Sequence, residues 1–334
     1  ILMTGASVYG LSLISLYFSF SYISFMLIFT LPMALGVTMM GNISVSKLIS
    51  LWFRKYTGRA LGIASVGVSF AGFVFPNLTS FLLGDLGLTW REAYLLFGTL
   101  IILINVPVVY LFVVNKPSDI NQIPDGEEVT DNSEDTSGID WTIPDLLKDR
   151  NFWILSLVFA IQFCSMMGIL SHLTFFSEGA GWSPSWGAFI FSMYAWPAMF
   201  SKVFFGWLVE NKIDARVAVS AAILIQAIAT LLMIFVESPE QMVVLVMIFG
   251  FGGGSALPLS NILFNQAYTN KSFGKARGAA QPFISIFQIS GTLVAARMFD
   301  VFGNYDLAFL TLGFILIVPL IAIWFLKKEP KLAS

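Results

Sequence analysis

The chain has 334 residues, of which 57% are hydrophobic and 11% are charged, and its formal net charge is -2 at pH 7. Soluble domains carry roughly 25% charged residues, so this composition excludes an ordinary soluble protein and indicates a chain that lies in a lipid bilayer. The single cysteine, Cys164, excludes a disulfide framework and a cysteine-based zinc site. A net charge this close to zero says nothing about binding partners.

Ten long apolar runs recur along the sequence. They cover residues 1–20, 24–50, 60–84, 93–115, 152–176, 187–209, 216–236, 242–266, 278–299 and 306–326. Each run can cross about 30 Å of hydrocarbon as a helix that rises about 1.5 Å per residue. Strands of a transmembrane barrel need only about ten alternating residues, whereas these runs are longer and apolar on all sides. The sequence therefore predicts an all-α membrane protein with ten spans.

The placement of lysine and arginine predicts the orientation of these spans. Of the eighteen basic residues, Arg91 and Arg297 fall at one side, Lys202 lies inside a span, and the other fifteen sit at or beyond the opposite span ends. Cytoplasmic loops carry the excess of basic residues, so we expect the side with fifteen to be cytoplasmic. Both ends of the printed chain are then expected to face the cytoplasm, as an even number of spans requires.

One long polar segment separates four spans from six. Residues 116–151 hold ten of the twenty acidic residues together with proline, serine and glycine, a composition typical of a flexible linker. We expect an N-terminal half over residues 1–115, an acidic cytoplasmic linker over 116–151 and a C-terminal half over 152–334. A solvating tether is the simplest role for such a run, and a regulatory contact is the alternative.

Every third span lacks polar residues. The first, fourth, seventh and tenth spans carry no charge and little polarity, whereas the spans between them carry the polar residues. Transporters built from three-helix repeats place one helix of each unit outside and the others around the path. If the apolar spans are the third members, the chain begins at the third helix of twelve. We therefore expect ten of twelve transmembrane helices here, in a 4 + 6 arrangement, with two more helices upstream of Ile1.

Several short motifs occur in order along these spans. The stretch "LWFRKYTGRALGIASVGVSFAG" (Leu51 to Gly72) precedes Trp90 and Arg91, and the second half holds "SHLTFFSEGAGWS", "SKVFFGWLVENKIDAR", "GFGGGSALPLSN" and "MFDVFGNYDLAF". In these motifs the chain resembles the major facilitator superfamily, in its monocarboxylate and oxalate/formate type branch. The resemblance covers nearly the whole chain and implies the major facilitator fold, N-terminally truncated, and secondary transport.

The segment "GWLVENKIDAR" is similar to the G-x-L-x-D-(basic) loop of that superfamily. Gly206, Leu208 and Glu210 stand at the matching positions, and Lys212 and Arg216 are its basic residues. The resemblance implies a latch between helices, in which Glu210 forms an ion pair that breaks as the two halves move. A solvated surface pair that contributes little is the alternative.

Lys202 sits inside an apolar run, eight residues before the first acid, Glu210. An isolated charge near the middle of a bilayer costs about 2.5 to 3.5 kcal/mol on insertion scales, so Lys202 is not expected to face lipid. Ala195, Ala198, Lys202 and Gly206 share one helix face, and such stripes of small residues pack or line cavities. We expect Lys202 to point inward and to hold a substrate carboxylate. Snorkelling to the membrane interface is the alternative.

The chain differs from the branch that it resembles in two ways, and both differences limit the range of expected substrates. The animal monocarboxylate carriers have an arginine at the position of Lys202 and an aspartate four residues earlier, where this chain has Ala198. The proton-handling acid is therefore absent. The oxalate carriers have a second lysine in the eleventh helix, and here residues 278–299 hold no basic residue before Arg297. The comparison favours a singly charged anion over a doubly charged one.

Polar side chains on other spans are further candidates. Amides in lipid must be satisfied, so faces that carry them are expected to line the bundle interior. The predicted substrate-binding residues, besides Lys202, are Asn261, Asn265, Gln281, Gln288 and Asn42, and Asn105 would lie on the same wall as Asn42. Association between helices is the alternative role for all of them.

His172, the single histidine, shares a helix face with Ser165 and Gly168. It is a candidate for proton coupling, because histidine is the side chain that ordinarily changes charge near neutral pH. A hydrogen-bonded structural histidine is the alternative.

The sequence thus predicts a multi-pass carrier, expected in the plasma membrane, that moves a small organic anion, most simply a monocarboxylate, by alternating access. A coupling proton is an option, as symporter or antiporter. We expect a monomer that contacts membrane lipid and binds no nucleic acid, metal, nucleotide or redox cofactor. An enzyme is not expected, because paired acid–base or metal-ligand groups inside the bilayer are missing. The alternatives are a carrier or exporter of an uncharged or drug-like solute, and a non-transporting sensor with the same fold.

Overall fold

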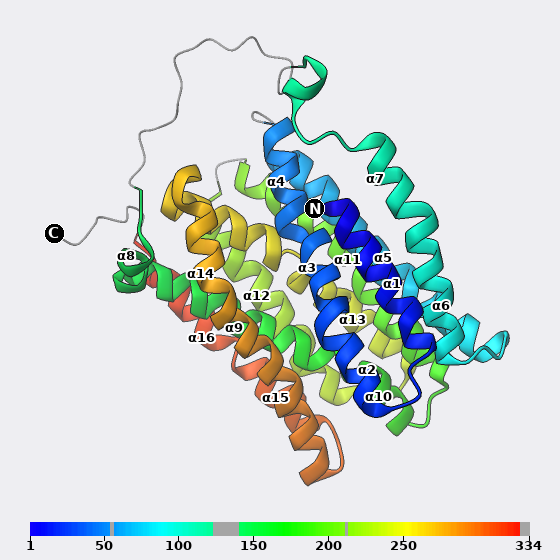
Figure 1. The fold of residues 1–334 in the computed structure, drawn as a ribbon. Coiled ribbons are helices and arrows are strands. Elements are labelled where there is room, and N and C mark those ends of the chain that lie inside the picture. Colours follow the sequence, from blue (N-terminus) through cyan, green and yellow to red (C-terminus); the bar gives the residue numbers. More distant parts are fainter. Residues whose placement is uncertain (54–56, 123–139, 211–212, 328–334) are drawn as a thin grey trace. The chain divides into compact units, whose positions relative to one another are not determined.

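The computed structural model describes residues 1–53, 57–122, 140–210 and 213–327 (Figure 1). The elements of this described part are helices, and no strand is among them. Contacts divide the chain into two compact units, one of residues 1–61 and 78–131 and the other of residues 62–77 and 132–334. The expected halves, 1–115 and 152–334, differ from these units mainly in residues 62–77, which group with the second half.

The described residues of the first unit form six α-helices, with short π-helical and 3-10 turns between or after them. They are α1 (Leu2–Tyr17), α2 (Tyr22–Ile28), η1 (Phe29–Met33), α3 (Ala34–Met40), α4 (Asn42–Trp52), η2 (Phe81–Asp85), α6 (Trp90–Leu100), η3 (Ile101–Asn105), α7 (Val106–Phe112) and η4 (Pro117–Ile120). Helix α5 (Thr57–Ser80) begins and ends in this unit, but its middle belongs to the second.

The second unit contains the remaining helices. They are α8 (Ile143–Lys148), α9 (Arg150–Leu170), α10 (Leu173–Gly179), α11 (Pro184–Glu210), α12 (Ala215–Leu232), η6 (Met233–Phe235), α13 (Pro239–Gly254), α14 (Ala256–Phe302), α15 (Asp306–Phe314), α16 (Ile317–Ala322) and η7 (Ile323–Phe325).

Nine helical segments of the described part are long and apolar enough to cross a membrane. They are Tyr22–Met40, Ile63–Asp85, Trp90–Phe112, Arg150–Gly179, Pro184–Val209, Ala215–Phe235, Pro239–Tyr268, Ser272–Phe302 and Asp306–Phe325. The apolar helix Leu2–Tyr17 is shorter. Together these segments match the ten apolar runs, so the prediction of an all-α membrane protein is confirmed.

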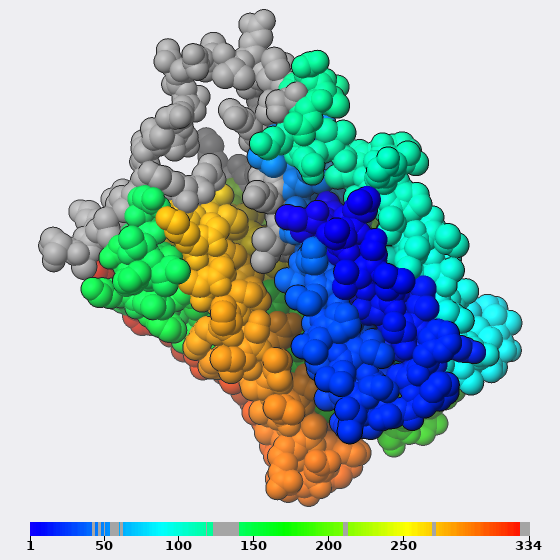
Figure 2. Space-filling model, in the orientation of Figure 1, coloured from blue at the N-terminus to red at the C-terminus, as the bar shows by residue number. Residues whose placement is uncertain are grey.

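Small residues let the helices of the first unit approach closely. A Cβ atom on Gly98 of α6 would lie 2.7 Å from the carbonyl oxygen of Gly10 on α1, and one on Gly36 of α3 would lie 2.6 Å from the backbone nitrogen of Tyr9. Neither position has room for a side chain. In Figure 2 the blue atoms of α1 and α3 lie directly against each other.

Helix α9 lies at the centre of the second unit. It belongs to the span Arg150–Gly179, in which 78% of the most apolar stretch is buried. Phe152 and Phe159 near its start and Ile169 near its end belong to two hydrophobic clusters, one toward each end of the spans. Helix α14 packs against α9 (Figure 1) at a point where a Cβ on Gly291 would lie 2.0 Å from the carbonyl oxygen of Cys164. Close packing of this kind replaces a hydrophobic driving force inside lipid.

The glycine run at the end of α13 also serves close packing. A Cβ on Gly250 would lie 2.3 Å from the carbonyl oxygen of Tyr194 on α11, and one on Gly252 would lie 2.6 Å from the carbonyl oxygen of Ala222 on α12. Helix α13 therefore touches the backbones of both neighbours, and these glycines belong to helix packing.

Helix α14 reverses direction along its length. In a straight helix, about 1.5 Å of rise per residue would place residues 261 and 277 about 24 Å apart. Instead, Nε of Arg277 donates a hydrogen bond of 3.3 Å to Oδ1 of Asn261. The chain therefore folds back between the spans Pro239–Tyr268 and Ser272–Phe302, which agrees with the two separate runs in the sequence.

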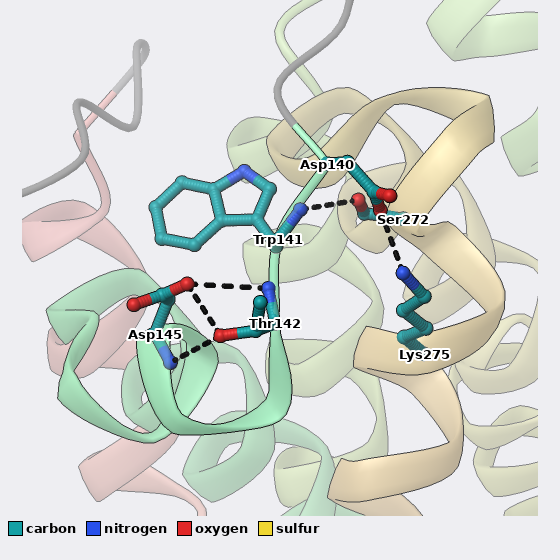
Figure 3. A network of polar contacts seen from close by, with 6 residues as sticks. All are labelled: Asp140, Trp141, Thr142, Asp145, Ser272 and Lys275. Carbon is teal, nitrogen blue, oxygen red and sulfur yellow. Dashed lines mark hydrogen bonds and ion pairs between the residues drawn. The ribbon is translucent and has the colours of Figure 1, made fainter.

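The segment before α9 is fastened to this reversal (Figure 3). Trp141 is only 3% exposed, its backbone N–H donates to Oγ of Ser272 at 2.9 Å, and its ring meets the ring of Tyr268 edge to face at 5.4 Å. Nζ of Lys275 lies 2.6 Å from Oδ1 of Asp140. The Tyr268 hydroxyl also donates to a carboxylate, that of Asp149 at the start of α9.

This docking differs from the expected linker, which reached residue 151. Thr142 and Asp145 form a reciprocal cap that begins α8, and Leu146 of α8 is fully buried. The buried apolar side chains of Trp141 and Leu146 offset the entropy cost of ordering this end of the segment. The described end of the linker is therefore ordered.

Candidate functional site

Lys202 lies on α11 and is 8% exposed. Its Nζ donates one hydrogen bond to the backbone carbonyl of Ser65 at 3.0 Å and a second to Oγ of Ser69 at 2.7 Å. Both acceptors lie on the part of α5 that belongs to the second unit. The ammonium is therefore bonded to a neighbouring helix inside the protein.

The charge of Lys202 has hydrogen-bond partners but, among the described residues, no carboxylate partner. The ion pairs of the described residues join Arg216 to Asp214 and Lys275 to Asp140, and none includes Lys202. An ammonium has three donors, of which α5 takes two. A buried charge is stable only when it is paired and hydrogen-bonded. The site can therefore accept an anion, whose charge would offset that of Lys202 and whose oxygen would take the third N–H group.

Small residues set the position of α11 and so of Lys202. A Cβ on Gly254 of α13 would lie 2.4 Å from Cβ of Ala198, and one on Gly72 of α5 would lie 3.3 Å from Cβ of Ala195. The predicted stripe of small residues thus serves packing at Ala195 and Ala198. Gly206 has no atom within 4 Å of its would-be Cβ.

Ser65 and Ser69 lie in the third apolar run, and neither was a predicted site residue. Their role as partners of Lys202 was missed, because a helical pattern shows which residues share a face but not which helix that face meets. The available signal was the i, i+4 spacing of two hydroxyl residues inside an apolar span.

Two of the predicted amide residues meet around a second basic residue, Arg277. Asn261 accepts from Nε, and Oε1 of Gln281 accepts from Nη1 of Arg277 at 2.9 Å. Nε2 of Gln281 then donates to Oγ of Ser285 at 3.2 Å, and the guanidinium lies 5.6 Å from the ring centre of Phe264. The sequence analysis counted Arg277 only as a loop charge. Its position four residues before Gln281 was the signal for this network.

The other amides have separate surroundings. Asn265 is exposed, with a contact of its own, and Gln288 is half-buried on α14. Asn42 begins α4, with a side chain outside the described part, and Asn105 is exposed at the end of η3. The two hydrogen bonds of Lys202 go to α5, so no bond recorded in the described part joins Lys202 to a predicted amide.

His172 lies between α9 and α10 and uses both ring nitrogens. Nε2 lies 3.1 Å from the backbone oxygen of Thr292, and Nδ1 lies 3.1 Å from the hydroxyl of Tyr305. A carbonyl oxygen only accepts, so Nε2 carries a hydrogen, and in the neutral ring Nδ1 accepts from the Tyr305 hydroxyl. Burial first, and then the charge of Asp300, raise the pKa of the Tyr305 hydroxyl, which keeps this donor protonated.

The predicted latch is described only in part. The side chain of Glu210 and the whole of Lys212 lie outside the described residues. Arg216 binds Asp214, with Nη2 2.6 Å from Oδ2, and Asp214 also caps α12 by accepting from the Arg216 N–H at 3.0 Å. The sequence analysis missed Asp214 as the partner of Arg216. Its place directly before a helix is the usual signal of an N-cap.

Comparison with known proteins gives matches along the whole chain. A family model described as Major Facilitator Superfamily matches residues 1–212 and 181–334. Monocarboxylate transporter 13 of Bos taurus is 24% identical over 271 residues, which are 79% of this chain and 59% of that protein. An MFS-type transporter of Gibberella moniliformis is 23% identical over 305 residues, covering 89% of this chain and 67% of that protein.

Among solved structures, the human organic anion transporter MFSD10 (TETRAN) matches with a TM-score of 0.70. The match covers 96% of this chain and 76% of that chain at 16% sequence identity. An identity this low shows a shared fold alone. The chain spans about 59% of the length of the bovine relative.

Proposed function

The chain belongs to the major facilitator superfamily, and from this premise we propose that it is a secondary carrier of a small organic anion, most simply a monocarboxylate. Its relatives and its fold are those of multi-pass membrane transporters and not of enzymes. The observation that carries the proposal is the buried ammonium of Lys202, which has two acceptors on α5 and no recorded carboxylate partner.

The chemistry of Lys202 favours an anion over an uncharged solute. A charge inside the membrane is costly unless it is paired, and a substrate carboxylate that binds the free N–H group supplies the missing charge. One cation suits a singly charged anion. The name of one similar protein, a monocarboxylate transporter, supports the same substrate class.

Alternating access requires that the helices around Lys202 move. Pro76 lies inside α5 and Pro197 inside α11, five residues before Lys202. Proline removes one backbone hydrogen bond of a helix and allows it to bend. In this proposal α5 and α11 change their mutual angle when the substrate carboxylate takes over part of the bonding of Lys202.

We further propose that His172 carries the coupling proton. The Tyr305 hydroxyl, which donates to neutral Nδ1, can rotate to accept from a protonated Nδ1, because a hydroxyl is both donor and acceptor. His172 can thus gain a proton without losing its partners on α14 and before α15. The residues of the predicted latch, Gly206, Glu210, Lys212 and Arg216, would then act at the cytoplasmic end of α11.

Uptake of radiolabelled solutes into proteoliposomes tests the substrate class. We expect uptake of short monocarboxylates, with weaker uptake of dicarboxylates and none of their uncharged amides. Transport of the amides at the same rate would favour the uncharged-solute carrier instead. Binding of an anion without any uptake would favour a sensor.

The proposed orientation places both chain ends and residues 116–151 in the cytoplasm of a cell whose plasma membrane holds the carrier. It rests on the fifteen basic residues at one side. A cysteine at Ser133 should react with impermeant maleimide only from inside, and one at Ser183 only from outside. The parent protein is the control, because its Cys164 is buried. Labelling of both cysteines from outside would overturn the orientation.

A further inference from the structure

A cavity of about 460 Å³ lies in the second unit where four membrane spans end. Its walls include Val209 at the end of one span, Ala215 at the start of the next, Ala267 near the end of a third and Leu326 after the last. Because these walls lie at or near span ends, the cavity lies near a boundary between hydrocarbon and water. Its volume falls in the range of roughly 300 to 1,000 Å³ that small-molecule sites occupy.

The cavity has an apolar floor and a polar, basic wall. Leu263, Ala267 and Leu326 of the floor are buried, at 2%, 8% and 9% exposure. Arg216 and Lys327 supply the cations of the wall. A site of this composition suits a ligand with an anionic head and an apolar body.

The backbone of Lys327 and the side chain of Arg216 are both held in place. The side chain of Asn151 accepts from the backbone N–H of Lys327 and donates to its carbonyl, each at 3.0 Å, so the end of the last span is fixed to the start of α9. Asp214 holds Arg216 through Nε and Nη2. A guanidinium has five N–H donors, so donors remain on Nη1 for a further acceptor.

The balance of charge favours an anion. Arg216 and Asp214 neutralise each other, and the ion pairs of the described residues do not include Lys327. The described wall therefore carries one net positive charge. Arg150 stands close by, with its guanidinium 5.8 Å from the ring centre of Phe325, just before Leu326.

The surroundings of the cavity indicate lipid as the source of the anion. Ile213, Trp324 and Phe325 near the rim are 38%, 54% and 56% exposed, and the guanidinium of Arg216 lies 5.7 Å from the ring centre of Trp324. Exposed tryptophan and cations at span ends are typical of the headgroup level of a bilayer. Basic pockets between transmembrane helices bind anionic headgroups.

We propose that this cavity binds the headgroup of an anionic phospholipid. The phosphate contacts Lys327 and Nη1 of Arg216, and the acyl chains leave along Ile213, Trp324 and Phe325. The site lies outside the contacts of Lys202, and the proposal does not depend on what the protein transports.

Native mass spectrometry of the protein taken from nanodiscs tests this site. With equal amounts of phosphatidylglycerol and phosphatidylcholine, we expect the wild type to retain phosphatidylglycerol preferentially. Loss of one interfacial cation removes about 1 kcal/mol of lipid binding, so Lys327→Ala should weaken phosphatidylglycerol retention about fivefold. Lys327→Arg should retain it.

Lys148→Ala is the matched control, because Lys148 is an exposed lysine at the end of α8 and does not line the cavity. It should change retention less than about twofold. An equal loss in Lys148→Ala and Lys327→Ala would mean diffuse surface charge and would overturn the site. Equal retention of the two lipids would also overturn it. Displacement of phosphatidylglycerol by millimolar glycerol 3-phosphate would overturn the lipid assignment in favour of a soluble phosphate ligand.

Discussion

The Nζ atom of Lys202 lies 2.7 Å from Oγ of Ser69, a residue 133 positions earlier in the chain. This contact joins α11 to α5, the helix whose middle leaves the first half of the sequence to pack in the second unit. In a carrier that changes shape, a bond between two proline-containing helices is a place where substrate binding can affect the conformation.

Replacement of Lys202 tests the anion site directly. A hydrogen bond to a charged group contributes about 1.5 to 3 kcal/mol, so Lys202→Ala should lower uptake at subsaturating anion by about tenfold or more. Removal of a buried cation without a counter-charge should leave thermal stability nearly unchanged. Lys202→Arg should keep some uptake with altered preference, because guanidinium binds a carboxylate at two points. Wild-type uptake and half-saturation in Lys202→Ala would contradict the assignment.

Two serines on one helix give a matched pair of variants. Lys202 binds the side chain of Ser69 but the backbone carbonyl of Ser65. Ser69→Ala removes an acceptor of the ammonium, whereas Ser65→Ala retains the carbonyl. We expect Ser69→Ala to change the half-saturation for the anion several-fold, by about 1 kcal/mol, with a smaller change for Ser65→Ala. Anion titrations of initial uptake rates give both values, and equal effects would show that the hydroxyl of Ser69 does not position Lys202.

The fold could be predicted from the sequence because the length of apolar runs is set by the bilayer. Ten runs gave ten helical segments, and the cost of burying one charge was enough to select Lys202. Contacts between helices that are distant in the sequence could not be predicted in this way. The pairing of Lys202 with Ser69 depends on which helix faces meet. The periodic pattern within one helix does not contain that information.

Two further differences have the same physical origin. Arg277 was counted among the basic residues at or beyond span ends, yet the reversal of α14 brings Asn261 to it, so that two amide oxygens accept from the guanidinium. Trp141 was included in a flexible linker by the composition of the residues around it. The burial of Trp141 against Tyr268 stabilises the segment despite that composition, because one buried aromatic ring can hold a short segment in place.

A side chain at Gly254 should disturb the helix that carries Lys202. Its Cβ would lie 2.4 Å from that of Ala198, so Gly254→Ala must push α13 away from α11. Overpacking of this kind costs about 1 to 3 kcal/mol, and we expect lower thermal stability and lower uptake. Gly67→Ala on α5 is the control, because no atom lies within 4 Å of its Cβ and alanine favours the helix. A Gly254→Ala protein as stable as Gly67→Ala would contradict the close approach.

The docked segment before α9 should stabilise the second unit mainly through Trp141. Large-to-small changes at buried aromatic residues cost about 3 to 5 kcal/mol, so Trp141→Ala should lower the unfolding temperature strongly. Lys275→Ala removes an ion pair whose two side chains are each 48% exposed, and such pairs contribute less than about 1 kcal/mol. Thermal unfolding in detergent compares the two variants. A larger loss for Lys275→Ala would show that the ion pair, and not the ring, fastens the segment.

The proposed coupling role of His172 is separable from its structural role by two variants. His172→Gln retains an N–H group for the Thr292 carbonyl but cannot take up a proton near neutral pH. We expect it to fold and to exchange anion while losing the acceleration of uptake by an inward proton gradient. Tyr305→Phe removes the hydroxyl that faces Nδ1 and leaves the imidazole in place, so the response of uptake to the gradient should persist. The test is the initial uptake rate, measured from about pH 5 to 8, where histidine ordinarily titrates. If His172→Gln keeps the full response to the proton gradient, His172 only links α9, α14 and Tyr305 by hydrogen bonds.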